Sequence, residues 1–139
     1  MTPDASTKAG ARALERLETE LIGWLTTMNP DGQPQSTPIW FLWLGEEVLI
    51  YSAKRAPRNG NVADRPRVAF NFNTDPGGGD VVTMEGEARV DLTTTPPDRN
   101  ESYLAKYGGM LDENEWTPEY FAAEYPLPII VRPTRWRLG

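Results

Sequence analysis

A basic group follows an apolar run near the middle of the chain, although the formal net charge of the whole chain is −6; its members are Lys54, Arg55, Arg58, Arg65 and Arg67. Within this group, Ser52, Arg55, Arg58 and Asn61 combine hydroxyl, guanidinium and amide groups where a strand is expected to end and a short helix to begin. Such donors, together with the backbone N–H groups of a helix N-terminus, suit a phosphate or another small anion. The alternative interpretation is a solvated surface turn whose arginines pair with nearby carboxylates, and both stay open at this point.

The residue content excludes several classes of site. The chain contains no cysteine and no histidine, which excludes disulfides, cysteine nucleophiles, Ser-His-Asp triads and zinc fingers. The acidic residues show no metal-ligand spacing, and Gly77–Gly79 matches neither the Walker nor the Rossmann pattern, so no metal is assigned. The net negative charge argues against nucleic acid as a partner, because binding to a phosphate backbone requires a broad basic face. No side chain is assigned as catalytic.

A length of 139 residues fits one domain with a substantial hydrophobic core. The N-terminal residues carry no apolar segment of the kind found in a signal peptide, and no run approaches the ~20 apolar residues that span a membrane. We therefore expect a soluble, cytoplasmic protein without a membrane partner.

Periodicity predicts a few helices, of which the first is the clearest. Its apolar residues recur at intervals of three and four, and Ser6 or Thr7 is suited to cap its start. A later helix is expected to stop at Gly108 and Gly109, because consecutive glycines commonly end helices. Helical segments are thus expected at residues 7–20, 58–65 and 94–107, and from Thr117 onward.

The remaining pattern is that of short strands joined by hairpin-type turns. Such a series favours a small antiparallel barrel over a doubly wound parallel sheet, and Gly86 is a candidate for a β-bulge. The fold class is therefore mainly β, with an N-terminal helix at residues 1–20, a barrel core at 21–91, a helical segment at 94–125 and a closing strand at 128–139. The predicted strands are residues 21–28, 36–44, 47–53, 67–73, 81–92 and 129–138.

The run from Ser36 to Leu44 is interpreted as one strand that is apolar on both faces. Both faces must be covered, either by helices or by a second subunit, so we expect a homodimer. Near the C-terminus, Trp136 lies between Arg135 and Arg137. This tryptophan either stacks on a ligand ring or belongs to an ordinary edge strand.

Longer motifs resemble a known family. WLTTMNPDGQPQSTPIWFLWLGEEVLIYS is followed by R-x-x-N-V, by DRPRVAFNF and by GGGDVVTMEGEARV. In this order they resemble the pyridoxamine 5′-phosphate oxidase-like superfamily, and more narrowly its group B of deazaflavin-dependent oxidoreductases. The resemblance is strong from Leu21 to Val90 and looser towards the C-terminus. It implies a six-stranded split β-barrel of the FMN-binding type, assembled as a homodimer.

The resemblance also implies a cofactor site between the subunits. Residues after the third strand would hold the cofactor phosphate, Trp136 would approach from the second subunit, and the strand from Gln35 to Trp40 would lie beside the ring system. The implied cofactor-binding residues are Ser52, Arg55, Arg58, Asn61, Gln35, Ser36, Thr37, Pro38, Trp40 and Trp136.

The expected function is hydride transfer between coenzyme F420 and a small reducible organic molecule, with the cofactor supplying the hydride. The nearest alternative keeps the fold and uses FMN, whose single phosphate would occupy the same residues. Two rivals of other classes stay open, a carrier that binds the cofactor without turnover and a dimeric structural protein without a cofactor. Additional arginines such as Arg55 favour the deazaflavin, because its tail is long and acidic.

Overall fold

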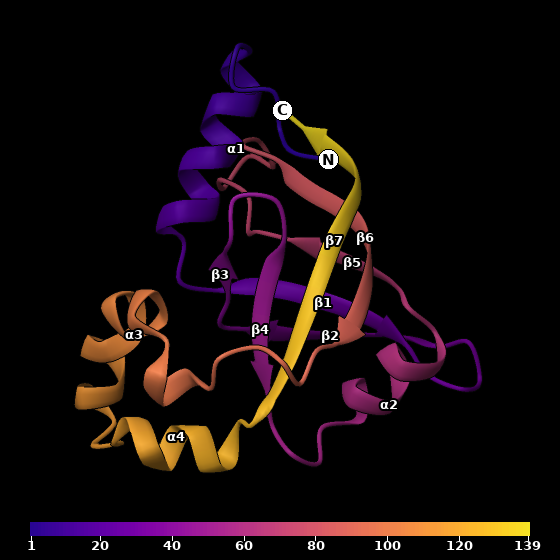
Figure 1. The fold of residues 1–139 in the computed structure, drawn as a ribbon. Coiled ribbons are helices and arrows are strands. Elements are labelled where there is room, and N and C mark those ends of the chain that lie inside the picture. The colour runs from indigo at the N-terminus through magenta and orange to yellow at the C-terminus, as the bar shows by residue number, and fades with distance from the viewer.

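The computed structural model describes all residues from 1 to 139. Four α-helices and seven strands are joined mostly by short loops (Figure 1). In chain order they are α1 (Lys8–Thr19), β1 (Gly23–Met28), β2 (Pro34–Ile39), β3 (Leu42–Trp43), β4 (Val48–Ser52), α2 (Pro57–Asp64), β5 (Arg67–Asn71), β6 (Val82–Val90), a 3₁₀ turn (Pro97–Arg99), α3 (Glu101–Glu113), α4 (Pro118–Glu124) and β7 (Leu127–Leu138).

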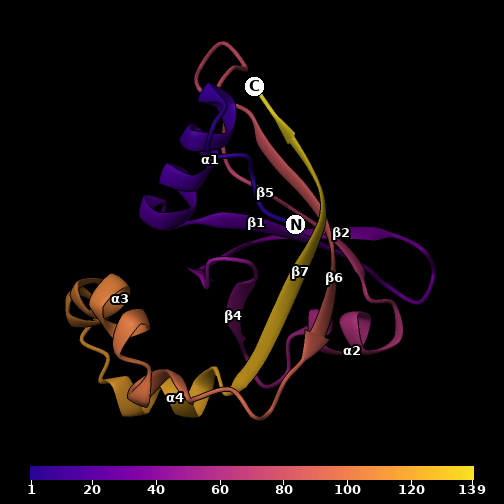
Figure 2. The ribbon, with the colours of Figure 1, turned by 45° about the horizontal axis from the view of Figure 1, so that its top comes forward.

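All strands belong to one curled sheet with the order β2-β1-β5-β6-β7-β4-β3, and every neighbouring pair is antiparallel. Both views place α3 and α4 together at the opposite end of the molecule from α1 (Figures 1 and 2). The predicted antiparallel split barrel is confirmed. It has seven strands instead of six because the run expected to form one strand over 36–44 is divided into β2 and β3.

Local signals explain why α1 and the bulge lie where they were predicted. The hydroxyl of Thr7 accepts a hydrogen bond from the Gly10 amide and caps α1, and Leu17 anchors the helix in the main core. In β6, the pairing with β7 shifts between Glu85 and Gly86. A Cβ atom at Gly86 would lie 2.8 Å from the Arg132 carbonyl oxygen, so the close approach of the two strands requires glycine.

The aromatic run packs both faces, as predicted, but not as one continuous strand. Phe41 belongs to the main core, whereas Trp40 packs against a second aromatic cluster under α3 and α4. At the break, the Phe41 N–H donates to the Tyr107 hydroxyl over 2.8 Å instead of to a neighbouring strand. Helices of the same chain therefore cover the second face, and homodimerisation stays a prediction.

The prediction that α3 stops at Gly108 and Gly109 was wrong, because the helix continues to Glu113. Asn100 caps its start by accepting from the Tyr103 amide, and Leu111 beyond the glycines is buried. Burial of an apolar residue on each side of the pair outweighs the ~1 kcal/mol that each glycine costs within a helix.

Candidate functional site

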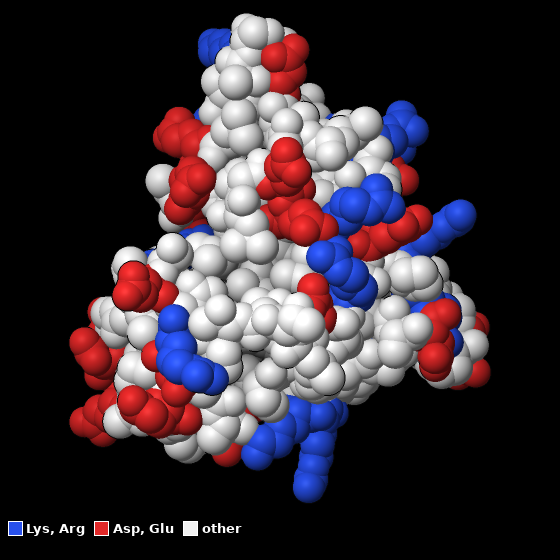
Figure 3. All heavy atoms as spheres, viewed as in Figure 1, with Lys and Arg blue, Asp and Glu red and all other residues white.

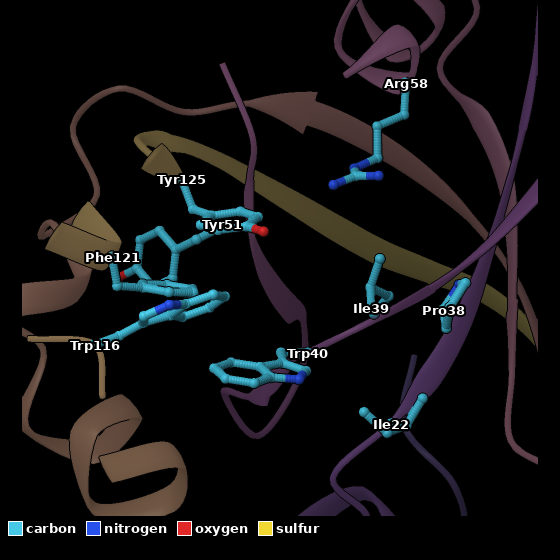
Figure 4. A pocket seen from close by; sticks show the side chains of 9 residues that line it. All are labelled: Ile22, Pro38, Ile39, Trp40, Tyr51, Arg58, Trp116, Phe121 and Tyr125. Atoms are coloured by element: carbon cyan, nitrogen blue, oxygen red, sulfur yellow. The ribbon is translucent and has the colours of Figure 1, made fainter. Parts of the chain in front are cut away.

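An aromatic pocket of about 280 Å³ opens where the β2–β3 break, β4, α2 and α4 meet. A volume near 300 Å³ is at the lower limit of pockets that hold drug-sized ligands. Most of the lining is apolar, and no acidic residue contributes to it. The lining residues are Ile22, Pro38, Ile39, Trp40, Tyr51, Arg58, Trp116, Phe121 and Tyr125 (Figure 4).

Arg58 is the cation of this pocket, and its guanidinium group points towards the pocket interior (Figure 4). Its Nε donates to the Ser52 hydroxyl over 2.9 Å, and no carboxylate lies within ion-pair distance of the guanidinium. Burial lowers the pKa of Arg58, and the charge of Tyr125 opposes this effect. A half-buried cation without a counter-ion gains most from an anionic ligand, because the cost of desolvation has already been met in the folded chain.

Ser52 and Asn59 hold Arg58 in place. Ser52 is fully buried, and its hydroxyl donates to Asn59 Oδ1 over 2.6 Å while accepting from Arg58. Asn59 Nδ2 donates to the carbonyl oxygens of Ala53 and Lys54. Ser52, the first predicted phosphate ligand, therefore contacts Arg58 and lies beneath the surface. Asn59 was missed, and its spacing of seven residues from Ser52 gives no signal before the loop is folded.

Asn61 lies on the same helix but faces away from the pocket. Its Nδ2 donates to Thr27 Oγ1 and to Gln35 Oε1, each over 3.0 Å. Both amide hydrogens are thus used to join α2 to β1 and β2. The structure does not bring Asn61 together with Arg58 at the pocket.

Except for Trp40, which follows β2, the predicted ring-binding residues lie on β2, an edge strand paired only with β1. Its outer backbone N–H and C=O groups are therefore open to a ligand. The Ser36 hydroxyl shares a hydrogen bond of 2.7 Å with the Thr26 hydroxyl, whereas Pro38 and Trp40 line the pocket itself. Thr37 lies between these residues on the same strand.

Lys54 and Arg55 occupy the loop between β4 and α2, where both are exposed and make no ion pair. Basic side chains project from the lower edge of the molecule, where this loop runs, whereas acidic side chains gather over α3 and α4 (Figure 3). An anionic group is therefore favoured on the side of the loop.

Trp136 lies towards the opposite end of β7 from the pocket. Leu127 of β7 pairs with Ser52, so Trp136 is about 30 Å farther along the strand at 3.3 Å per residue. Its Nε1 donates to the Met1 carbonyl oxygen, and its ring packs edge-on against Trp43. Within one chain, Trp136 does not join the other predicted cofactor residues.

Of the aromatic wall of the pocket, the sequence analysis predicted Trp40 and missed Phe121 and Tyr125. Trp40 stacks on Phe121 with ring centroids 5.5 Å apart, and Phe121 stacks on Tyr125 at 4.6 Å. These rings come from residues about 80 positions apart in sequence and meet only through packing, although apolar residues on a short helix after Thr117 gave a partial signal. No helix is long and apolar enough to span a membrane, and no group of His, Cys, Asp and Glu side chains is arranged to hold a metal.

Comparisons with known proteins identify the family. The family model described as pyridoxamine 5′-phosphate oxidase matches residues 10–125, which is most of the chain. The chain belongs to the pyridoxamine 5′-phosphate oxidase family. None of the curated sequences compared with the chain matches it.

Solved structures with a similar fold carry names that describe different functions. An F420 reductase is 26% identical with a TM-score of 0.65, and the match covers 88% of this chain and 94% of that one. A conserved hypothetical protein of Mycobacterium tuberculosis is 22% identical with a TM-score of 0.73, covering 95% and 84% of the two chains. The heme storage protein HutZ of Vibrio cholerae is 14% identical with a TM-score of 0.62, covering 99% and 95%.

The residues present fit a phosphate-bearing planar cofactor of the flavin type, which this fold binds. Arg58 offers a guanidinium that no carboxylate neutralises, the pocket is lined by aromatic rings, and the edge of β2 offers backbone donors and acceptors. A phosphate, a flat ring system and a polar ring edge each have a matching group.

Proposed function

We propose that this protein is an oxidoreductase that uses coenzyme F420 to transfer a hydride to or from a small organic molecule. The observation that carries the proposal is Arg58, a half-buried guanidinium fixed by Ser52 and free of any carboxylate at the mouth of an aromatic pocket. When bound, the reduced cofactor supplies the hydride, so the chemistry requires no nucleophilic side chain.

The side chains would then bind and orient the cofactor and exclude water from the site. Arg58 would hold the cofactor phosphate, and Ser52 and Asn59 would keep the guanidinium in position. The β2 backbone between Gln35 and Trp40 would hold the ring edge, while the aromatic wall keeps water from the reacting atoms. Asn61 would act indirectly by fixing α2 against β1 and β2.

FMN is the alternative cofactor, because its phosphate would use the same Arg58. The exposed Lys54 and Arg55 beside the pocket favour the deazaflavin, whose acidic tail extends past the phosphate. The 26% identity to an F420 reductase gives further support. A homodimer, in which Trp136 of one subunit approaches the site of the other, and a cytoplasmic location are parts of the same proposal.

The test is a fluorescence titration of the purified protein with coenzyme F420 and, separately, with FMN. Loss of a charge-assisted hydrogen bond of about 1.5–3 kcal/mol predicts that Arg58→Met weakens F420 binding by about 10- to 150-fold. Arg67→Met is the matched control, since Arg67 belongs to the same basic group but is exposed and lies outside the pocket.

The double variant Lys54→Met with Arg55→Met separates the two cofactors. It should weaken F420 binding more than FMN binding, because FMN lacks the acidic tail that Lys54 and Arg55 would contact. Tighter binding of FMN than of F420 by the wild type would reassign the cofactor, and binding of neither would contradict the proposal.

A further inference from the structure

A second hollow, a broad groove of about 770 Å³, lies where the end of α1, β3 and α3 meet (Figure 1). It shares no lining residue with the aromatic pocket, and the proposed function leaves it unused. Half of its lining residues are apolar, and one of them is a lysine. This lysine groove is lined by Glu18, Leu42, Trp43, Leu44, Gly45, Ser102, Ala105 and Lys106.

Lys106 of α3 is held in the groove by the tip of its side chain. Its Nζ donates to the Phe41 carbonyl oxygen over 2.9 Å and lies 3.7 Å from the centroid of the Phe41 ring. No carboxylate lies within ion-pair distance of the amine, because Glu18 is farther away and Glu20 pairs with Arg16 over 2.9 Å. Lys106 is therefore a half-buried amine with a fixed direction and no counter-ion.

The protonation state of this amine follows from its surroundings. Burial lowers the pKa of Lys106 to about 8, against the attraction of Glu18 and Glu20. At about pH 7.5 an amine with this pKa is unprotonated to about one quarter, whereas a lysine of ordinary pKa is unprotonated to about one part in a thousand. Desolvation of this kind makes a lysine amine nucleophilic. Lys106 thus offers a free electron pair to a molecule in the groove.

The neighbours of the amine select among the electrophiles that react with lysine. Carbamylation by CO₂ would place a negative charge near Glu18, and acylation would remove the positive charge from the face of the Phe41 ring. An aldehyde gives an iminium ion, which keeps the positive charge and one N–H for the Phe41 carbonyl oxygen. Of the three products, only the iminium ion retains both of these interactions.

The walls of the groove restrict the rest of the aldehyde. Leu42, Leu44 and Ala105 present apolar side chains, and Leu44 is 49% exposed, so it has surface to bury against an aliphatic chain. Glu18 is the acidic side chain of the lining and disfavours an anionic aldehyde. An uncharged aldehyde with an aliphatic chain is therefore the best complement.

We propose that Lys106 is a covalent binding site for uncharged aliphatic aldehydes, which it holds in the lysine groove as a protonated Schiff base. This inference goes beyond the proposed function, because it requires neither Arg58 nor a cofactor.

The reaction balances without an oxidant or a reductant. The Nζ electron pair forms a bond to the aldehyde carbon, while the π pair of the C=O bond moves to the oxygen, which takes a proton. Loss of this oxygen as water then leaves a C=N double bond. In total, one ammonium group and one aldehyde give one iminium ion and one water molecule, so the charge is unchanged and hydrolysis reverses the step.

The chain supplies its own controls for a labelling experiment, because its two other lysines, Lys8 and Lys54, are exposed. Hexanal and cyanoborohydride are added near neutral pH, the iminium ion is reduced to a stable secondary amine, and peptide mass spectrometry quantifies each lysine. Lys106 should be labelled about tenfold faster than Lys54 or more, since its larger share of free amine outweighs the lower nucleophilicity of a weaker base. Equal labelling of the three lysines, or slower labelling of Lys106, would overturn the proposal.

The ratio of Lys106 to Lys54 labelling then tests the class of aldehyde. Glyoxylate, an anionic aldehyde, should give a lower ratio than hexanal, and Glu18→Gln should raise the glyoxylate ratio. Leu44→Ser should lower the hexanal ratio about three- to tenfold and leave the formaldehyde ratio unchanged, because formaldehyde has no chain to contact the leucine. The same ratio for all three aldehydes in the wild type would overturn the assignment to uncharged aliphatic aldehydes.

Calorimetry without the reductant tests whether binding is covalent. The wild type should bind hexanal saturably, and Lys106→Arg should lose this binding, because arginine keeps a cation and N–H donors but does not form the imine. Hexanal binding that persists in Lys106→Arg would overturn the Schiff base. Because these assays contain no cofactor, selective labelling of Lys106 in a protein that binds neither F420 nor FMN would support the aldehyde site and contradict the proposed function. F420 binding with uniform labelling would do the reverse.

Discussion

Tyr107→Phe should destabilise the protein strongly, although it removes a single oxygen atom. The Tyr107 hydroxyl accepts from the Phe41 N–H over 2.8 Å and lies 2.9 Å from the Phe41 carbonyl oxygen and 2.8 Å from that of Leu21. Both Tyr107 and Phe41 are fully buried. Without the hydroxyl, the Phe41 N–H has no partner in the core, whereas the exposed Leu21 carbonyl can bond to water.

The magnitude follows from the cost of an unpaired buried donor. Loss of the bond together with the orphaned N–H predicts a decrease of about 2–3 kcal/mol in the free energy of unfolding. At roughly 4 °C per kcal/mol for a domain of this size, the midpoint of thermal unfolding should fall by about 8–12 °C. Urea titration gives the free energy of unfolding. An unchanged m-value would show that the wild type and the variant expose the same surface on unfolding, so that their free energies can be compared.

Tyr103→Phe is the matched control on the same helix. Tyr103 is equally buried and packs against Tyr107 with ring centroids 4.9 Å apart, but its hydroxyl has no hydrogen-bond partner. Removing that hydroxyl should leave stability unchanged or raise it by about 1 kcal/mol, because an unsatisfied polar group is taken out of the core. Equal losses in Tyr103→Phe and Tyr107→Phe would refute the reasoning from hydrogen bonds.

Two further predictions concern the half-buried Lys106 and the helix α2. Burial lowers the pKa of Lys106 from its ordinary value of 10.5 to about 8. Between these two values the unfolded chain binds more protons than the folded one, so the free energy of unfolding should rise with pH there. In urea titrations at several pH values, Lys106→Met should lack this rise relative to the wild type, and parallel curves for both proteins would contradict the lowered pKa. Gly60→Ala, in the interior of α2 with open space around the added methyl, should raise the free energy of unfolding by about 0.5–1 kcal/mol without altering F420 affinity. A loss of stability would contradict the helical geometry at Gly60.

Features set by neighbouring residues were predictable from the sequence. Ser52 ends β4 and Arg58 lies in the first turn of α2, joined by one short loop, so residue types and spacing sufficed to place Arg58 near Ser52. The hairpin turns and the cap of α1 also depend on contacts within a few residues. Asn61 was assigned to the pocket because it is close to Arg58 in sequence, but the helix turns its amide towards β1.

Features set by distant residues could not be predicted in the same way. A strand was expected to continue through Trp40 and Phe41 because nothing nearby breaks it. The break depends on Tyr107, which lies 66 positions away. Likewise, glycine pairs normally end helices, and α3 continues because Tyr107 and Leu111 are buried on either side of the pair. In each case the tertiary contact outweighs a local preference.

The break in the sheet also links stability to the site. The Phe41 peptide is held by the Tyr107 hydroxyl and by Lys106 Nζ, which donates to the Phe41 carbonyl oxygen over 2.9 Å. These bonds place the preceding Trp40 against Phe121 and so complete the aromatic wall of the pocket. A continuous strand would keep this peptide in the ladder and leave the aromatic wall without Trp40. Helices α3 and α4 therefore contribute both the wall of the pocket and the polar contacts that bend the strand towards it.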